Sequence, residues 1–168
     1  MALHGDLRSM SVEGIEEYLA IAEHCTTTRK ANGGIYGFPA VLLLFCVVDA
    51  LSVNSGARPH SLEKIACVVP GLSQWQIKNL RRWYRDLLAH QAVIAPGTVL
   101  SDADGAAIEF NSSGEPTHIR VISFYRAVRS MWESFRQSTI NPAVHTLKLP
   151  KTPMVTTNAP GITGCLHK

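Results

Sequence analysis

The feature that most constrains the fold is an almost unbroken apolar run from Phe38 to Val48, within IYGFPAVLLLFCVVDALSV. A helix that is apolar on nearly every side must lie in the centre of a fold, where other elements cover its faces. The run is too short to span a bilayer, which takes about 20 apolar residues, and the acidic Asp49 follows it directly. We therefore expect a buried core helix from about Phe38 to Leu51, with Pro39 in its first turn.

Length and composition are those of a globular protein with one domain. The 168 residues are 46% hydrophobic and 17% charged, which is enough apolar material for a sizeable core. The net charge of +3 is mild, so it permits contact with a polyanion without requiring it. The segment MALHGDLRSM has no apolar stretch of signal-peptide type, and we expect a cytoplasmic protein without a membrane partner.

The cysteines and histidines do not have the spacing of a metal site. There is no C-x-x-C pair, and His24, His60 and His118 are scattered, so we expect neither a metal nor another cofactor. Cys46 and Cys67 lie in apolar runs, which predicts buried free thiols and no disulfide framework.

Apolar residues at helical intervals predict helices on both sides of the central one. The first should cover residues 11–27 and begin with Ser11 as its cap. A short helix should start at Ser61 and end before PGLS. A long helix should run from Ser73, again a cap, to His90 or Ala92. Its apolar side consists of Trp75, Ile77, Leu80, Tyr84, Leu87 and Leu88.

After the long helix the pattern changes to the alternation typical of strands. AAIEF and THIRVIS are joined by the turn NSSGEP, which predicts a β-hairpin over about 106–122, with Ile119 and Val121 facing one side. Helical spacing returns over 123–137. Residues 1–137 are thus predicted as a mainly α domain, a bundle of about five helices with an inserted β-hairpin. Residues 138–168 contain four prolines and no periodicity, and we expect an extended or loosely attached tail.

The long helix carries RRWYRDLLAHQ, in which Arg85 and Asp86 precede His90. Asp86 and His90 are four residues apart and therefore neighbours on a helix, where the carboxylate can hydrogen-bond the imidazole. Arg85 and His90 lie about 140° apart around the helix, so one copy does not readily bring both onto a small ligand. Two copies that face each other across a twofold axis can do so in a shared groove.

The same residues also fit an ordinary helix surface. Arg82 and Asp86 can form a simple ion pair, and a histidine near a helix C-terminus suits the helix dipole. Asp49 is the one charge on the apolar helix. It either pairs with Arg85 and positions it, or sits at an exposed C-terminal turn. At the level of the residues these alternatives stay open.

RDLLAH resembles the R-x4-6-H signature of the HEPN superfamily (higher eukaryotes and prokaryotes nucleotide-binding), in which Asn, Asp or His often follows the arginine. The resemblance covers about residues 11–137, and only the short signature is specific. It implies an α-helical bundle that dimerises through the motif helices, and many members are metal-independent endoribonucleases. For this chain it implies that Arg85 clamps the scissile phosphate. His90 would act as general base or acid, and Asp86 would orient His90.

The resemblance also implies an RNA product that ends in a 2′,3′-cyclic phosphate. Basic residues on the last two long helices would guide the RNA backbone, namely Lys78, Arg81, Arg82, Arg126 and Arg129. Members that pair with nucleotidyltransferase antitoxins often carry a tyrosine two positions after the histidine, where this chain has Ala92. Control through such a tyrosine is therefore not expected. Many members of the superfamily are non-catalytic homodimeric modules, which is an alternative for this chain.

Residues 61–92 also have the outline of a helix-turn-helix. A short helix, a break at Pro70–Gly71 and a longer helix with a polar start match that motif, and the hairpin could serve as a wing. The residues that would contact DNA are Gln74, Gln76, Lys78 and Arg81. Trp75 predicts burial near this end, and the mild charge offers few phosphate contacts. Both points favour the HEPN-type hypothesis.

Overall fold

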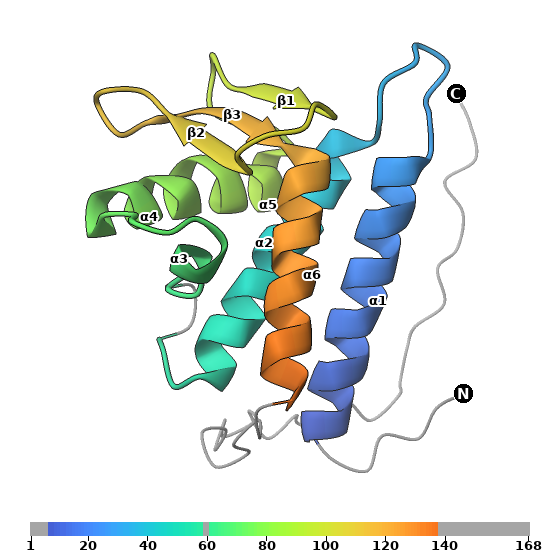
Figure 1. Cartoon of the computed structure of the whole chain (residues 1–168), viewed down its shortest axis with the longest axis vertical. Coiled ribbons are helices and arrows are strands. Elements are labelled where there is room, and N and C mark those ends of the chain that lie inside the picture. Colours follow the sequence, from blue (N-terminus) through green and yellow to red (C-terminus); the bar gives the residue numbers. More distant parts are fainter. Residues whose placement is uncertain (1–6, 59–60, 138–168) are drawn as a thin grey trace, which may run out of the picture.

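The computed structural model describes residues 7–58 and 61–137. Its helices are α1 (Leu7–Thr27), α2 (Gly37–Asn54), α3 (Ile65–Val68), α4 (Gln74–Leu80), the π-helical η1 (Arg81–Asp86), α5 (Leu87–Gln91) and α6 (Val121–Gln137). Its strands are β1 (Val99–Ser101), β2 (Ile108–Phe110) and β3 (Pro116–Arg120). The described fold is mainly α, as the sequence predicts, with a small sheet across one end of the helices (Figure 1). The predicted tail, 138–168, lies outside the described residues.

The apolar helix α2 forms the centre of the core, and α1 and α6 pack against it (Figure 1). Ten of its residues are buried, and Phe45 packs against Phe124 of α6 with ring centroids 5.2 Å apart. By length and composition α2 is the one helix in the described part that could cross a membrane, and 56% of it is buried in the fold. The prediction of a central helix is confirmed, because its apolar residues face protein on several sides.

The predicted serine caps differ in outcome. Ser73 caps α4 as predicted: Ser73 Oγ accepts from the Gln76 backbone N–H, and Gln76 Oε1 accepts from the Ser73 backbone N–H. Ser11 is not a cap, because α1 already begins before it. Ser61 is not a cap either, because α3 begins only after it and has no side-chain cap hydrogen bond.

The sheet has three strands in the order β1-β3-β2, and the sequence predicted two of them. Strands β2 and β3 pair antiparallel, as in the predicted hairpin, but β1 adds to the other side of β3 in parallel. The central Ile119 pairs with Leu100 on one side and Ile108 on the other, and it is fully buried. The prediction that Val121 continues the strand is wrong, because β3 ends at Arg120 and Val121 is the first residue of α6.

Two exposed residues correct the sequence predictions for a common reason. Cys67 is exposed and Trp75 is 57% exposed, although Cys67 lies in an apolar run and Trp75 was predicted to lie on the apolar side of its helix. Each lies two positions along the chain from a buried isoleucine of the same helix, Ile65 and Ile77 respectively. On a helix this separation is about 200°, so the two side chains point to opposite sides. Apolar residue type alone therefore assigned them to the wrong face.

Glu16 of α1 binds α6 through three side chains. Glu16 Oε1 accepts from Trp132 Nε1 at 2.7 Å and from Arg136 Nη1 at 3.0 Å, and Oε2 accepts from Arg129 Nη1 at 2.8 Å. Burial by itself would raise the pKa of Glu16, but these hydrogen bonds and the two guanidinium charges hold the pKa below its usual value. The carboxylate therefore stabilises the α1–α6 contact.

We expect Glu16→Gln to lower the free energy of unfolding by about 2 kcal/mol at pH 7, because hydrogen bonds to a charged acceptor are lost. A folded pKa below the unfolded one stabilises the protein above the unfolded pKa, and the stabilisation is lost as the pH falls through the folded pKa. The difference between wild type and variant should therefore shrink below pH 4.5, the ordinary value for this group. Urea unfolding at pH 7 and pH 3 measures it. The exposed Glu17 provides the control Glu17→Gln, with an expected change under about 0.5 kcal/mol. A Glu16 effect as large at pH 3 as at pH 7 would contradict the linkage.

Candidate active site

The helix that carries the predicted motif is irregular at the motif itself. Residues Arg81–Asp86 form the π-helical segment η1, between α4 and α5. In a π-helix the backbone bonds join residues five apart, and such segments often occur at functional sites. Here Arg81 Nε lies 3.9 Å from Asp86 Oδ2, although residues five apart are about 140° apart on an α-helix. This contact takes the place of the simple pair between Arg82 and Asp86 that the sequence allowed.

Arg85 lies between two carboxylates. Its Nη1 donates to Asp86 Oδ1 at 2.9 Å, and its Nη2 is 3.5 Å from Asp49 Oδ2 of the core helix α2. The side chain of Arg85 is 18% exposed and that of Asp49 is 12% exposed. Of the two alternatives for Asp49, the ion pair with Arg85 is present and the exposed turn is not. The consequence is a guanidinium that is fixed on two sides and still reaches solvent.

His90 lies on α5, one helical turn beyond Asp86, and is exposed. The helix ends directly after it, at Gln91, and Ala92 adopts a left-handed conformation with φ 54°. This end agrees with the predicted one. In the described part of the chain the contacts of the Asp86 carboxylate are to Arg81 and Arg85. Orientation of His90 by Asp86 therefore stays a prediction.

Cys46 is a neutral neighbour of the Arg85–Asp49 pair. It precedes Asp49 on α2 and is partly buried. Burial raises the pKa of its thiol; Arg85 acts in the opposite direction, and Asp49 adds to the rise. The thiol is thus protonated at neutral pH, which makes it a poor nucleophile.

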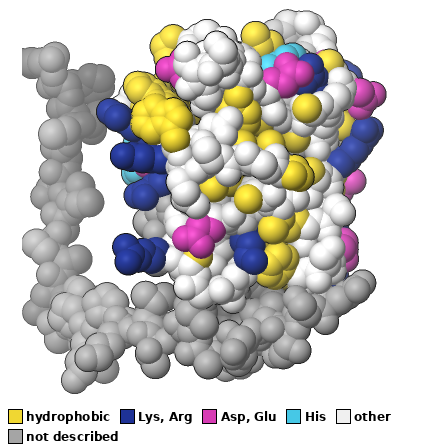
Figure 2. All heavy atoms as spheres, turned by 60° about the vertical axis from the view of Figure 1, so that its left-hand side comes forward, with side chains coloured by type: hydrophobic (Ala, Val, Ile, Leu, Met, Phe, Trp, Pro, Cys, Tyr) yellow, Lys and Arg dark blue, Asp and Glu magenta, His cyan; other side chains and the backbone are white. Residues whose placement is uncertain are grey.

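The basic residues that the sequence assigned to RNA fall into two groups. Lys78, Arg81 and Arg82 are exposed on α4 and η1, near Arg85 in the chain. Arg126 and Arg129 lie on α6 and form ion pairs there, Arg126 with Asp104 and Arg129 with Glu16 and Glu133. Figure 2 shows Lys and Arg side chains along one edge of the described part, next to a hydrophobic patch. The group on α4 and η1 is the one that accompanies the motif.

The start of α4 is less suited to DNA than the helix-turn-helix outline suggested. The preceding helix α3 has only four residues. Gln76, a predicted DNA contact, uses its side chain in the capping box with Ser73. Gly114, in the turn between β2 and β3, packs here as well: a Cβ at this position would be 3.5 Å from both Gln76 and Trp75. Trp75 is exposed, so the prediction that it is buried is wrong. The packing of the turn next to Gln76 and Trp75 is the observation that argues against DNA binding at this end of α4.

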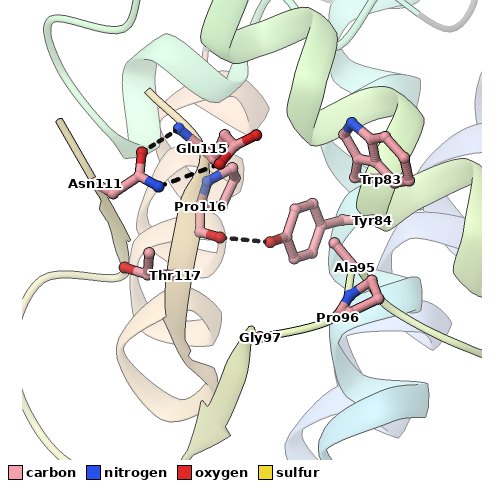
Figure 3. A pocket seen from close by; sticks show the side chains of 9 residues that line it. All are labelled: Trp83, Tyr84, Ala95, Pro96, Gly97, Asn111, Glu115, Pro116 and Thr117. Atoms are coloured by element: carbon pink, nitrogen blue, oxygen red, sulfur yellow. Dashed lines mark hydrogen bonds between the residues drawn. The ribbon is translucent and has the colours of Figure 1, made fainter. Parts of the chain in front are cut away.

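A pocket of about 350 Å³ beside η1 was not predicted. Figure 3 shows the residues that line it: Trp83, Tyr84, Ala95, Pro96, Gly97, Asn111, Glu115, Pro116 and Thr117. Tyr84 is fully buried; its hydroxyl donates to the Pro116 carbonyl at 2.8 Å and also bonds Thr98 Oγ1. Burial raises the pKa of Tyr84, so the phenol stays neutral and can donate. This tyrosine ties η1 to the hairpin and so shapes the pocket.

The sequence suggested that His118 is isolated, but in the structure its imidazole lies close to other polar side chains. Ser101 Oγ lies 2.6 Å from His118 Nε2, across the pair of strands β1 and β3. Glu109 Oε2 is 3.8 Å from His118 Nδ1, which is too long for a hydrogen bond, and Glu109 Oε1 accepts from Arg120 Nη1 at 2.7 Å. The contacts among Ser101, Glu109, His118 and Arg120 are therefore cross-strand polar pairs of the sheet.

Among the described residues, no group of three or more His, Cys, Asp or Glu side chains could hold a metal ion. Comparison with protein families, with curated proteins and with solved structures finds no match to this chain. Inference about function therefore depends on the side chains themselves, and on the site around Arg85 above all.

Proposed function

We propose that this chain is a HEPN-like, metal-independent endoribonuclease, a cytoplasmic homodimer of helical bundles with composite sites formed by Arg85 and His90. The observation that supports it best is the state of Arg85. Its guanidinium is held by Asp49 and Asp86 on a π-helical segment, one turn before an exposed histidine. A guanidinium held in this way is already positioned before a phosphate binds.

The chemistry assigned to the two residues is phosphodiester transesterification. Arg85 binds the oxygens of the scissile phosphate, for which its planar, permanently charged guanidinium is suited. The ribose 2′-oxygen attacks the phosphorus, and the bond from phosphorus to the 5′-oxygen breaks. His90 accepts the 2′-hydroxyl proton as general base, or protonates the leaving 5′-oxygen as general acid. The products are a 2′,3′-cyclic phosphate and a 5′-hydroxyl.

A second copy of the chain completes the site in this proposal. Arg85 is mostly buried and directed to α2, whereas His90 is exposed near the helix end. The side chains of one copy therefore serve different directions. Across a twofold axis, the exposed histidine of one copy can approach the guanidinium of the other, and the symmetry makes two such sites.

The test is cleavage of single-stranded RNA by the purified chain in the presence of EDTA. We expect 2′,3′-cyclic phosphate ends, and a rate at least about 100-fold lower for His90→Ala. Because His90 is exposed, the variant should unfold like the wild type. His24→Ala, at an exposed histidine of α1, is the matched control and should cleave normally. A folded dimer without cleavage would instead be the non-catalytic interaction module.

A further inference from the structure

The pocket beside η1 has two walls of different character. Trp83 and Ala95–Gly97 lie on one side, whereas the polar side chains of Asn111, Glu115 and Thr117 lie on the hairpin (Figure 3). The volume of about 350 Å³ is at the lower end of the range for small-molecule sites. Such a pocket suits a flat group with one polar edge, and a nucleobase is such a group.

Trp83 supplies a stacking surface. Its side chain lines the pocket although the residue is 39% exposed. The Arg82 guanidinium carbon lies 5.1 Å from the centre of its ring, on one face of the indole. Aromatic side chains and guanidinium groups bind single-stranded nucleic acid by stacking on bases, and every base has a face that can stack. Stacking on Trp83 therefore contributes affinity for a base but does not distinguish one base from another.

Glu115 can determine which base the pocket prefers. Asn111 Oδ1 accepts from the backbone N–H groups of Ser113 and Glu115, and Asn111 Nδ2 donates to Glu115 Oε2 at 3.2 Å. Asn111 therefore holds the turn, and the exposed Glu115 carboxylate has one hydrogen bond to the same side chain. Glu115 Oε1 has no hydrogen-bond partner among the described residues. A carboxylate accepts hydrogen bonds and donates none.

Guanine is the base that matches such an acceptor. Its Watson–Crick edge presents two neighbouring donors, N1–H and N2–H, which one carboxylate can accept together. Adenine and cytosine place an acceptor nitrogen next to their amino group. Uracil has a single donor between two acceptors. Each of these three bases would turn a lone pair toward the Glu115 oxygens.

On the basis of the proposed endoribonuclease function, we propose that this pocket binds an unstacked guanine of single-stranded RNA and so selects where the chain cuts. Trp83 and Tyr84 directly precede Arg85 in η1, so the base pocket and the phosphate clamp belong to one element. Proteins that read RNA sequence commonly take single-stranded bases out of the stack in this way.

Binding of uncleavable RNA tests this inference separately from catalysis. The probes are labelled 2′-O-methyl oligouridylates with one central guanosine, adenosine, cytidine or uridine, followed by fluorescence anisotropy with the full chain. We expect the guanosine probe to bind at least about tenfold more tightly than the others. Glu115→Gln should remove most of that preference, and Trp83→Ala should weaken all four probes by about tenfold. Trp75→Ala, at an exposed tryptophan of α4 outside the pocket lining, should change neither.

The outcomes separate the two proposals. Equal binding of the four probes by the wild type overturns the pocket inference, and so does a guanine preference that Glu115→Gln leaves intact. Thermal unfolding shows that each variant is folded, so that a lost preference can be assigned to the missing carboxylate. A guanine preference in a chain that cleaves no RNA keeps the pocket and overturns the nuclease. RNA cleavage without any base preference does the reverse.

Discussion

Arg85→Ala is expected to lower the free energy of unfolding by about 3 kcal/mol, and to abolish RNA cleavage. The loss of stability follows from burial, because the Asp49 side chain is only 12% exposed and would lose the guanidinium that lies 3.5 Å away. The remaining carboxylates of Asp49 and Asp86 would also no longer have a cation between them. For a domain of this size we expect a decrease of the unfolding temperature by about 10 °C.

A second substitution separates the structural effect from the catalytic one. Asn at position 49 carries no charge, so Arg85→Ala combined with Asp49→Asn should recover more than half of the lost stability. RNA cleavage should stay at least about 100-fold below wild type, because the phosphate clamp is still missing. The control is Arg82→Ala, an exposed arginine of η1 that lies over Trp83, with an expected loss under about 1 kcal/mol. If Arg85→Ala unfolds like the wild type, the ion pair with Asp49 does not stabilise the fold, and the proposal that Asp49 holds Arg85 in place is contradicted.

The central helix was the easiest element to predict from the sequence. A run that is apolar on all sides has one stable place in a globular fold, and α2 occupies it. The cap at Ser73 was also predictable, since Ser and Gln three residues apart form a capping box. Both features depend on neighbours in the chain. Their physical cause is local, and the sequence displays it directly.

Strand β1 and the π-helical turn could not be predicted in this way. β1 has three residues and pairs in parallel with β3, a contact between segments distant in the chain that leaves no alternating pattern. In the π-helical η1, Arg81 and Arg85 both contact Asp86, and Arg85 also lies near Asp49 of α2, which no sequence pattern displays. A prediction from periodicity assumes a regular α-helix, in which Arg82 would be the neighbour of Asp86. In the structure Asp86 contacts Arg81 instead.

The candidate site was partly predictable for the same reason. The spacing of Arg85, Asp86 and His90 is visible in the sequence, and a lone acid on an apolar helix requires a partner, which indicated Asp49. The pocket was not visible, because its walls come from η1, from residues 95–97 and from the hairpin. The one signal was an aromatic residue, Trp83, next to arginines.

Mixing two inactive variants should restore cleavage if the site is composite. One partner is Arg85→Ala with Asp49→Asn, and the other is His90→Ala. In a mixed dimer one site combines both defects, whereas the other combines the intact Arg85 of one copy with the intact His90 of the other. After random exchange of subunits, half of the dimers are mixed and each has one working site. The expected activity is therefore about a quarter of the wild-type value, starting from two preparations that each show almost none.

Recovery of cleavage in this mixture would exclude a site formed within one copy. If Arg85 and His90 of a single chain acted together, each copy in the mixed dimer would lack one of them and cleavage would stay absent. Exchange must be shown independently, by differently labelled subunits that co-purify, so that failure to mix is not mistaken for failure to complement. The helix geometry favours recovery, because Arg85 is directed to α2 while His90 is exposed on the same helix. On an ideal α-helix about 140° separates their positions, which is why the proposal takes the missing group from a second copy.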